Sequence, residues 1–195
     1  MILINILVSF YFFNGVDIMD KLKKLINKYY TEKPFERIVV IGIGSSRVVY
    51  DSFGPFTVSL LKQYFIYSGK RCRFNLFLYG DLESPIHALN YDKRINEIEE
   101  IHKDKNVLYI VLDACKTMKK QKKNELHVKR KPTSPGSGVG KNLKSIGNIS
   151  VHNVLRNLPS EKCTYDDTYE AMPMNEMYIC SKKAAEILFY ALTEI

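Results

Sequence analysis

Runs of apolar, mostly β-branched residues alternate along the chain with segments whose apolar residues recur every three or four positions. The runs predict buried strands over Arg37–Ile43, Phe74–Tyr79 and Asn106–Leu112, and a short strand over Glu125–Lys129. The periodic segments predict helices over Asp20–Tyr30, from Pro55 onward, from Pro85 to about Glu100, and over Ser181–Thr193. This alternation predicts an α/β fold with a mostly parallel sheet and helices on both faces.

The chain opens on the apolar run MILINILVSFYFF, which is short for a membrane-spanning helix. It also lacks the basic start and the cleavage site of a signal peptide. A second methionine, Met19, precedes an amphipathic helical pattern. We therefore interpret residues 1–18 as an extension or a misassigned start, and residues 19–195 as a single α/β domain. A membrane anchor is the alternative for the opening run.

Composition adds a basic balance to this picture. The chain has a net charge of +8 and is 46% apolar, which is typical of a globular protein. Eight of its basic residues lie between Lys116 and Lys131, against one acid, Glu125. Such a segment is either a surface for phosphates or an acidic partner, or a solvated loop. It has no interleaved aromatic residues, so we do not expect nucleic acid as a partner.

The four cysteines are widely and irregularly spaced, at Cys72, Cys115, Cys163 and Cys180. This spacing supports neither a zinc site nor a disulfide framework, and it predicts reduced thiols in a cytoplasmic protein. Cys115 lies close to a candidate acid and could be a nucleophile. No histidine is near it in sequence, however, and a small buried apolar side chain is the other interpretation.

Two acids follow predicted strands: Asp51 lies in the loop after the first strand, and Asp113 ends the third. Ligands of open α/β sheets bind outside the carboxyl ends of the strands, where these two ends could lie side by side. Two close carboxyl groups supply a general base and a general acid, because one of them keeps a proton. The alternatives are a divalent cation held between Asp51 and Asp113, and two acids that merely cap turns or helices.

Two further stretches carry candidate polar residues. In YGDLESPIHALN, His87 and Asn90 are three residues apart and are expected on one face of a helix, where they could bind substrate. The segment 131–142 is a Gly/Pro/Ser-rich loop that contains Gly136, Gly138 and Lys141. Its GSGVGKN does not have P-loop spacing, and GIGSSR lacks the third glycine of a dinucleotide loop. No cofactor is predicted.

Five stretches occur in the order found in the YyaC-type sporulation proteins: IVVIGIGSSRVVYDSFGPF, YGDLESPIHALN, VLYIVLDAC, PGSGVGKNLKSIGNISV and the last helix. The resemblance covers about residues 36–192. These proteins are similar to the spore germination protease and, more distantly, to the hydrogenase maturation endopeptidases. The resemblance implies a three-layer α/β/α fold of the phosphorylase/hydrolase-like kind.

The resemblance also implies a spore-associated peptidase that hydrolyses peptide bonds with two aspartates. In the germination protease one lies in a D-x-x-G-P loop and the other at an I-D-A strand end. Here DSFGP contains Asp51 and LDAC contains Asp113. The implied substrates are proteins or peptides, such as small acid-soluble spore proteins, in the cytoplasm of the mother cell or forespore. The residues expected to contact them are His87, Asn90, Gly136, Gly138 and Lys141.

Three residues depart from the family pattern. Tyr50 replaces a usual Gly before the first aspartate, and Asn148 replaces the Asp of a VGDISI stretch. Ser52 occupies the position of the metal-binding Glu of the hydrogenase endopeptidases, and their His has no counterpart near Gly147. A nickel-dependent mechanism is therefore not expected. The alternative function is a catalytically inactive sporulation protein of the same fold that binds a peptide or protein partner.

Overall fold

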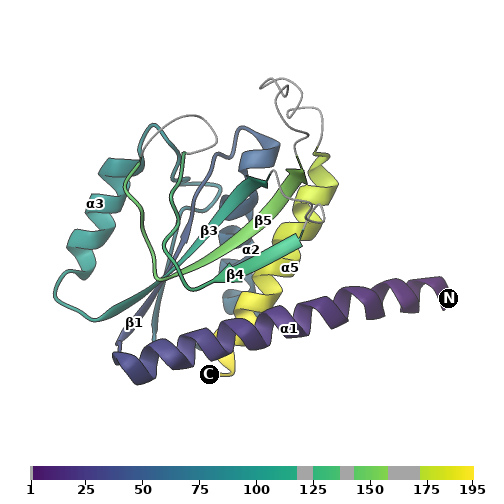
Figure 1. Ribbon diagram of the computed structural model, residues 1–195, viewed down its shortest axis with the longest axis horizontal. Helices are drawn as coiled ribbons and strands as arrows, with labels where there is room; N and C mark the ends of the chain where they lie inside the picture. Colours follow the sequence, from purple (N-terminus) through teal and green to yellow (C-terminus); the bar gives the residue numbers. More distant parts are fainter. Residues whose placement is uncertain (1, 118–124, 137–142, 158–171) are drawn as a thin grey trace.

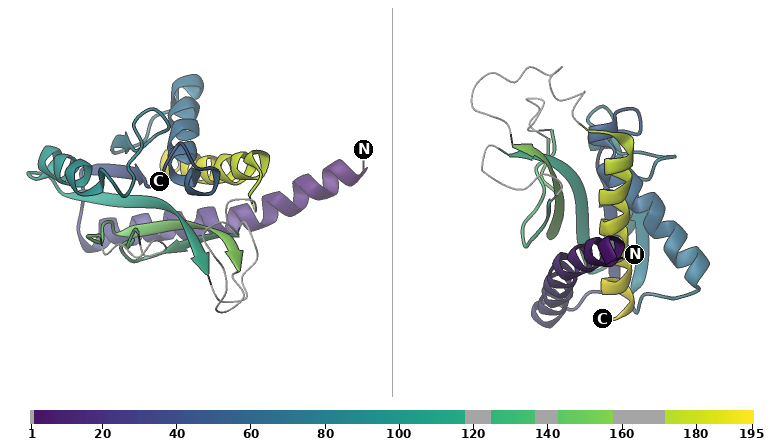
Figure 2. Two further views of the ribbon diagram at one scale, coloured as in Figure 1. Left: turned by 90° about the horizontal axis from the view of Figure 1, so that it is seen from above. Right: turned by 90° about the vertical axis from the view of Figure 1, so that its right-hand side faces the viewer.

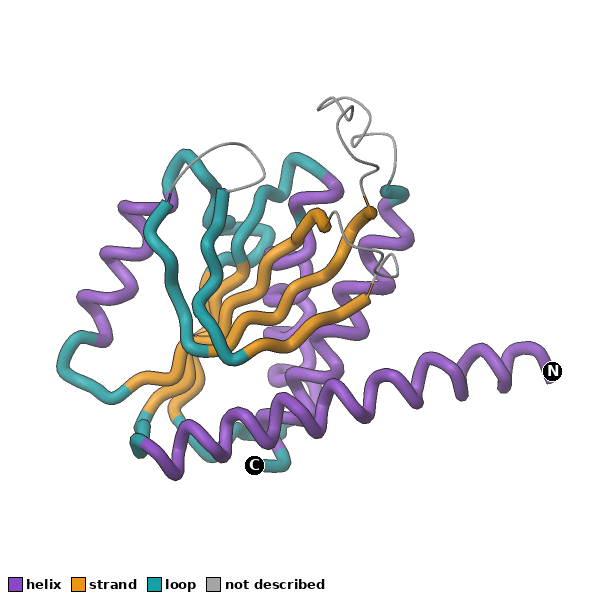
Figure 3. Tube along the Cα trace, in the orientation of Figure 1, coloured by secondary structure: helices purple, strands orange, loops and turns teal. Residues whose placement is uncertain are grey.

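The computed structural model describes residues 2–117, 125–136, 143–157 and 172–195. Its five strands form one sheet in the order β2-β1-β3-β5-β4 (Figures 1 and 3). They are β1 (Arg37–Gly42), β2 (Asn75–Tyr79), β3 (Val107–Thr117), β4 (Glu125–Lys129) and β5 (Ile149–Asn157). All neighbours are parallel except β4, which is antiparallel to β5. The predicted mostly parallel sheet is confirmed.

Helices cover both faces of this sheet. They are α1 (Ile2–Glu32), the short 3-10 helix η1 (Val49–Asp51), α2 (Phe53–Ser68), α3 (Tyr91–His102) and α5 (Met174–Thr193). The helices α1, α2 and α5 pack on one face and α3 on the other (Figures 1 and 2). The predicted three-layer α/β/α fold is therefore confirmed.

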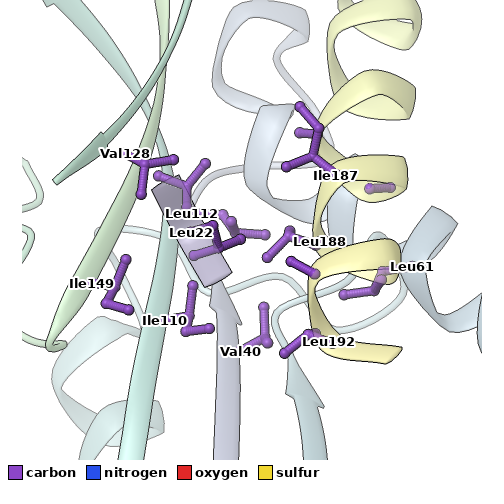
Figure 4. Packing of buried hydrophobic residues seen from close by; sticks show 14 of the residues in the cluster. Leu22, Val40, Leu61, Ile110, Leu112, Val128, Ile149, Ile187, Leu188 and Leu192 are labelled. Carbon is purple, nitrogen blue, oxygen red and sulfur yellow. The ribbon is translucent and has the colours of Figure 1, made fainter. Parts of the chain in front are cut away.

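The larger core lies between the sheet and α1, α2 and α5 (Figure 4). The side chains that meet there are fully or almost fully buried: Leu22, Val40, Leu61, Ile110, Leu112, Ile149, Leu188 and Leu192. Burying one such side chain contributes about 1.5–3 kcal/mol. The apolar face of the last predicted helix is thus used to hold α5 against α2 and the sheet.

The smaller core lies under α3. Successive side chains of a strand point to opposite faces, so Val111 points away from the α5 side and packs with Ile95 and Ile98 of α3. Asp113 is two residues further along β3 and faces the same side as Val111. The Asp113 side chain therefore points to the face of the sheet that α3 covers.

Four elements differ from their predicted bounds. α5 begins at Met174 instead of Ser181. α3 begins at Tyr91 instead of Pro85, because the residues before it form a turn closed by Asn90. β3 continues past Asp113, because β5 pairs with it as far as Thr117. α1 runs without a break from Ile2, so the predicted helix at 20–30 is its C-terminal part; the division at residue 18 stays a prediction. Among the described helices, α1 included, none combines the length and the apolar character that crossing a membrane requires.

Candidate functional site

The carboxyl end of β1 lies beside Leu112 of β3, the residue before Asp113, because the two strands are direct neighbours. The Ile43 N–H donates to the Leu112 oxygen over 2.8 Å and continues this pairing beyond β1. The chain then turns, and the Ser45 N–H donates to the Asp51 oxygen over 3.0 Å. Asp51 therefore sits at the end of a closed turn next to the end of β1.

Gly54 allows α2 to start directly against these strand ends. A Cβ atom at Gly54 would lie 2.5 Å from the Ile43 oxygen and 2.8 Å from the Leu112 oxygen. Contacts this short do not occur in real proteins, so only glycine fits here. Asp51 is three residues before Gly54, and Asp113 directly follows Leu112. The close approach of α2 thus brings the two acids to one place.

The pKa of the Asp113 carboxyl is raised well above its usual range. Loss of water around the carboxyl is the largest cause, and the neighbouring charge of Asp51 is the second. The Ala114 N–H bonds to the carboxyl and opposes this shift. Asp113 therefore keeps its proton at pH values where an exposed aspartate has lost it.

The turn that holds His87 and Asn90 lies beside the same end of β1, because the Gly44 N–H donates to the Ile86 oxygen over 2.8 Å. The prediction that His87 and Asn90 share a helix face is wrong. The Asn90 amide closes the turn: its Oδ1 accepts from the His87 N–H over 2.9 Å, and its Nδ2 donates to the Pro85 oxygen over 3.0 Å.

The His87 ring has a defined orientation in this turn. Its Nδ1 accepts from the Leu89 N–H over 3.3 Å, so a neutral ring carries its proton on Nε2. The ring thus offers an N–H donor from a half-buried position at the strand ends. The role of His87 and Asn90 in substrate binding stays a prediction.

The Gly-rich loop is described only at its two ends. Thr133 and Ile146 pair through two backbone hydrogen bonds, and Gly136 has a left-handed φ of 76°. The Tyr91 hydroxyl donates to the Lys144 oxygen over 2.8 Å and attaches the returning chain to α3. Gly138 and Lys141 lie outside the described residues, so their predicted contacts with substrate stay predictions.

The sequence reasoning missed two neighbours of Asp113. His152 of β5 is the direct partner of Asp113 in the parallel pair β3–β5. Burial, followed by the charges of Lys129 and Lys131, lowers the pKa of His152 to about 4. The alternation of ISVHN could have indicated this side chain, but only if the segment had been identified as a strand beside β3.

The second missed neighbour is Tyr91, the first residue of α3. It is 1% exposed, and burial followed by the Asp113 charge raises the pKa of its phenol above the usual value. The same two causes raise the pKa of the Cys115 thiol. Cys115 is therefore a neutral thiol at neutral pH, which fits a small apolar side chain better than an activated nucleophile.

Two of the residues that depart from the family pattern, Asn148 and Tyr50, make structural contacts. The Asn148 Oδ1 accepts from the Tyr109 N–H over 2.8 Å, and its own N–H donates to the Tyr109 oxygen over 2.9 Å. Tyr109 precedes Asp113 by four residues, or about 13 Å along a strand. Tyr50 packs against the apolar cluster of α1, α2 and α5. Asn148 therefore lies away from the acids, and Tyr50 has a packing role.

Metal ligands are not grouped in the described part of the chain. There, no three or more His, Cys, Asp or Glu side chains are arranged to hold a metal ion. A divalent cation between Asp51 and Asp113 stays a prediction.

The model of the family described as "Protein of unknown function (DUF1256)" matches residues 11–183. The chain belongs to the DUF1256 family. Among curated proteins, this DUF1256 chain is similar to the "Uncharacterized protein YyaC" of Bacillus subtilis (strain 168), with 35% identity over 118 residues. The match covers 60% of this chain and 53% of YyaC, so it spans about half the length of that relative. The predicted YyaC-type resemblance is thus confirmed.

Two solved structures resemble the DUF1256 chain more distantly. The [NiFe] hydrogenase maturation protease HycI from Thermococcus kodakarensis KOD1 has a TM-score of 0.49 and 14% identity, and the match covers 86% of this chain and 97% of HycI. A hydrogenase 2 maturation peptidase from a Thaumarchaeota archaeon has a TM-score of 0.40 and 12% identity, with 80% and 97% covered. Likeness at this level carries no argument about activity.

Proposed function

We propose that this protein hydrolyses peptide bonds with Asp51 and Asp113 as an acid–base pair. The observation that supports the proposal is the interaction between the two carboxyl groups beside the carboxyl end of β1. Burial and the Asp51 charge keep the proton on Asp113. Strongly shifted acids in such a position are characteristic of functional sites, and a protonated and an ionised carboxyl are what hydrolysis of an amide requires.

The proposed reaction assigns one proton transfer to each acid. Ionised Asp51 takes a proton from a water molecule while the water oxygen bonds to the carbonyl carbon of the substrate. The C–N bond of the resulting tetrahedral intermediate then breaks, and Asp113 gives its proton to the leaving nitrogen. The products are a carboxylic acid and an amine, and one proton must return from Asp51 to Asp113 before the next cycle.

The proposed substrate is a protein or peptide. In this proposal the His87 ring donates its Nε2–H to a backbone carbonyl of an extended substrate chain. The bond that Nδ1 accepts from the Leu89 N–H supports it, because that bond leaves Nε2 as the donor of a neutral ring. A net charge of +8 favours encounter with acidic partners. Small acid-soluble spore proteins in the cytoplasm of a sporulating cell are the proposed substrates, as the resemblance implies.

The test incubates the full-length chain with a small acid-soluble spore protein and identifies new chain ends by mass spectrometry. We expect Asp51→Asn and Asp113→Asn each to lower the rate of cleavage by about 10³-fold, since each removes one proton transfer. The matched control is Asp104→Asn, an exposed aspartate between α3 and β3, which should cleave at the wild-type rate.

Cleavage that survives both site variants would contradict the assignment of the two acids. Binding of the spore protein without cleavage by the wild-type chain would support the inactive binding protein instead, and it can be measured in the same samples by size-exclusion chromatography.

A further inference from the structure

Three titratable side chains form a row across neighbouring strands next to the site. Asp113 of β3 pairs with His152 of β5, and His152 pairs with His127 of β4. The residues on either side of them along the strands, such as Leu112, Val151 and Val128, belong to the core of α1, α2 and α5. Asp113, His152 and His127 therefore all point to the other face.

The spacing of this row is that of adjacent strands. Direct partners on neighbouring strands lie about 4.8 Å apart, and partners one strand further lie at about twice that distance. The His152 imidazole is thus the nearest ring to the Asp113 carboxyl in the sheet, while His127 is one strand too far to reach it. A register slip of one residue would send His152 to the opposite face.

Burial and the nearby basic groups of the described residues both favour the neutral form of His152. Burial is the largest cause of its lowered pKa, and Lys129, Lys131 and His127, on and after β4, lower it further. On the other side is Asp113, whose pKa is raised by burial first and by the Asp51 charge second, so that it holds a proton. A neutral imidazole always carries one N–H and one free lone pair, and it can donate the N–H to a carboxyl oxygen.

We propose that His152 is a positioning residue for Asp113, whose ring N–H donates to the Asp113 carboxyl as that group gives up its proton. This inference rests on the proposed function. A hydrogen bond to a neutral carboxyl is weak, and it strengthens when the carboxyl becomes an anion. The contact therefore favours the state in which the proton has passed to the leaving nitrogen, and it lowers the barrier for that step. His152 itself neither gains nor loses a proton.

The test follows the Asp113 carboxyl directly, in full-length protein with ¹³C-labelled aspartate carboxyl groups. An NMR titration gives its pKa, and the Asp113→Asn spectrum identifies its signal. We expect His152→Leu to raise the pKa of Asp113 by about one unit, because the anion loses a donor. His152→Asn, which keeps an N–H donor, should restore a value near that of the wild type.

The control His127→Leu changes the same face one strand further away and should leave the pKa of Asp113 unchanged. An unchanged pKa in His152→Leu would overturn the proposal. So would an equal rise in His152→Leu and His152→Asn, because removal of polarity alone would then explain it. If only one of the two variants folds, His152→Gln replaces the other.

The catalytic readout is separate. With a spore protein that the wild type cleaves, His152→Leu should lower kcat by about tenfold with little change in KM. The reason is that the hydrogen bond from His152 to Asp113 strengthens only during proton transfer. If no peptide is cleaved by the wild type but the pKa of Asp113 still depends on His152, the proposed function fails and the positioning contact stands. If cleavage occurs and the pKa of Asp113 does not depend on His152, the proposed function stands and the positioning role of His152 fails.

Discussion

Helix α3 covers two sets of titratable side chains, one near each of its ends, and their surroundings differ in kind. At its last residue, His102 is 1% exposed and both ring nitrogens are bonded. Arg37 donates to Nδ1 over 2.9 Å, so the proton is on Nε2, which donates to the Tyr79 hydroxyl over 3.1 Å. Burial, followed by the Arg37 charge, lowers the pKa of His102 and keeps the ring neutral.

At the first residue of α3, Tyr91 lies beside Asp113, whose partner group is a like charge. There, burial and Asp51 both oppose ionisation. At His102 the hydrogen bonds and the Arg37 charge all favour one protonation state, the neutral ring. At Asp113 two carboxylates would repel each other, and one proton removes that repulsion. Such an arrangement is expected of a site that transfers protons.

The largest effect should come from Gly54, where α2 starts directly against Ile43 and Leu112, the neighbours of the two acids. We expect Gly54→Ala to lower the free energy of unfolding by about 3 kcal/mol, because the new Cβ overlaps backbone atoms of two strands. Gly69→Ala at the end of α2 is the control: no atom lies within 4 Å, and only its φ of 66° resists, at about 1 kcal/mol. Equal losses in urea unfolding would contradict this steric account.

The next effect is a loss of folding stability at acidic pH, caused by His152. The folded-state pKa of His152, about 4, lies below the usual 6.5, so the unfolded chain binds more protons between these values. The contribution of His152 is complete above pH 6.5 and is lost as the pH falls toward 4. After a discount for partial exposure it is on the order of 2 kcal/mol. Urea unfolding from pH 8 to pH 4 should show it as a difference between the wild type and His152→Gln. The variant should be less sensitive to acid, and parallel curves would exclude the effect.

The third prediction concerns His102, whose two ring nitrogens are both hydrogen-bonded. We expect His102→Leu to cost about 1.5 kcal/mol, because Arg37 and the Tyr79 hydroxyl lose a buried partner. Tyr79→Phe removes only one of the two bonds and should cost less than His102→Leu. Thermal unfolding at pH 7.5 measures both, and a neutral His102→Leu would show that the bonds contribute little.

The smallest effect should be a gain. Asp113→Asn keeps the shape of the side chain and removes the like charge, so we expect about 1 kcal/mol of added stability at neutral pH. The sign follows from the raised pKa: the folded chain binds the proton more tightly, so stability falls as the pH rises from about 4 toward the folded pKa. The Asp113→Asn variant should lack this decline. A variant that is less stable than the wild type at pH 8 would contradict the proposed repulsion between Asp51 and Asp113.

The sequence supported the order of the elements and part of the site. Apolar runs located β1, β2 and the start of β3 to within one residue, because strands covered by helices are largely apolar. β2 was predicted to be buried, but it lies at the edge of the sheet and is only half-buried. The positions of Asp51 and Asp113 after such runs, with the neighbouring strands expected of this fold, predicted that the acids would meet. The bounds of α3 were missed, because the bonds of Asn90 that close the preceding turn are a matter of three-dimensional geometry.

What local pattern determined, then, was which residues are buried and where the chain turns. The tertiary structure decided which titratable groups share a face: His152 beside Asp113, Tyr91 against it, and His102 between Arg37 and Tyr79. Their partners are 22 to 65 residues away in sequence, and strand order and register decide which residues meet. The cost of a buried charge depends on those neighbours, so the proton on Asp113 exists only once the sheet is assembled.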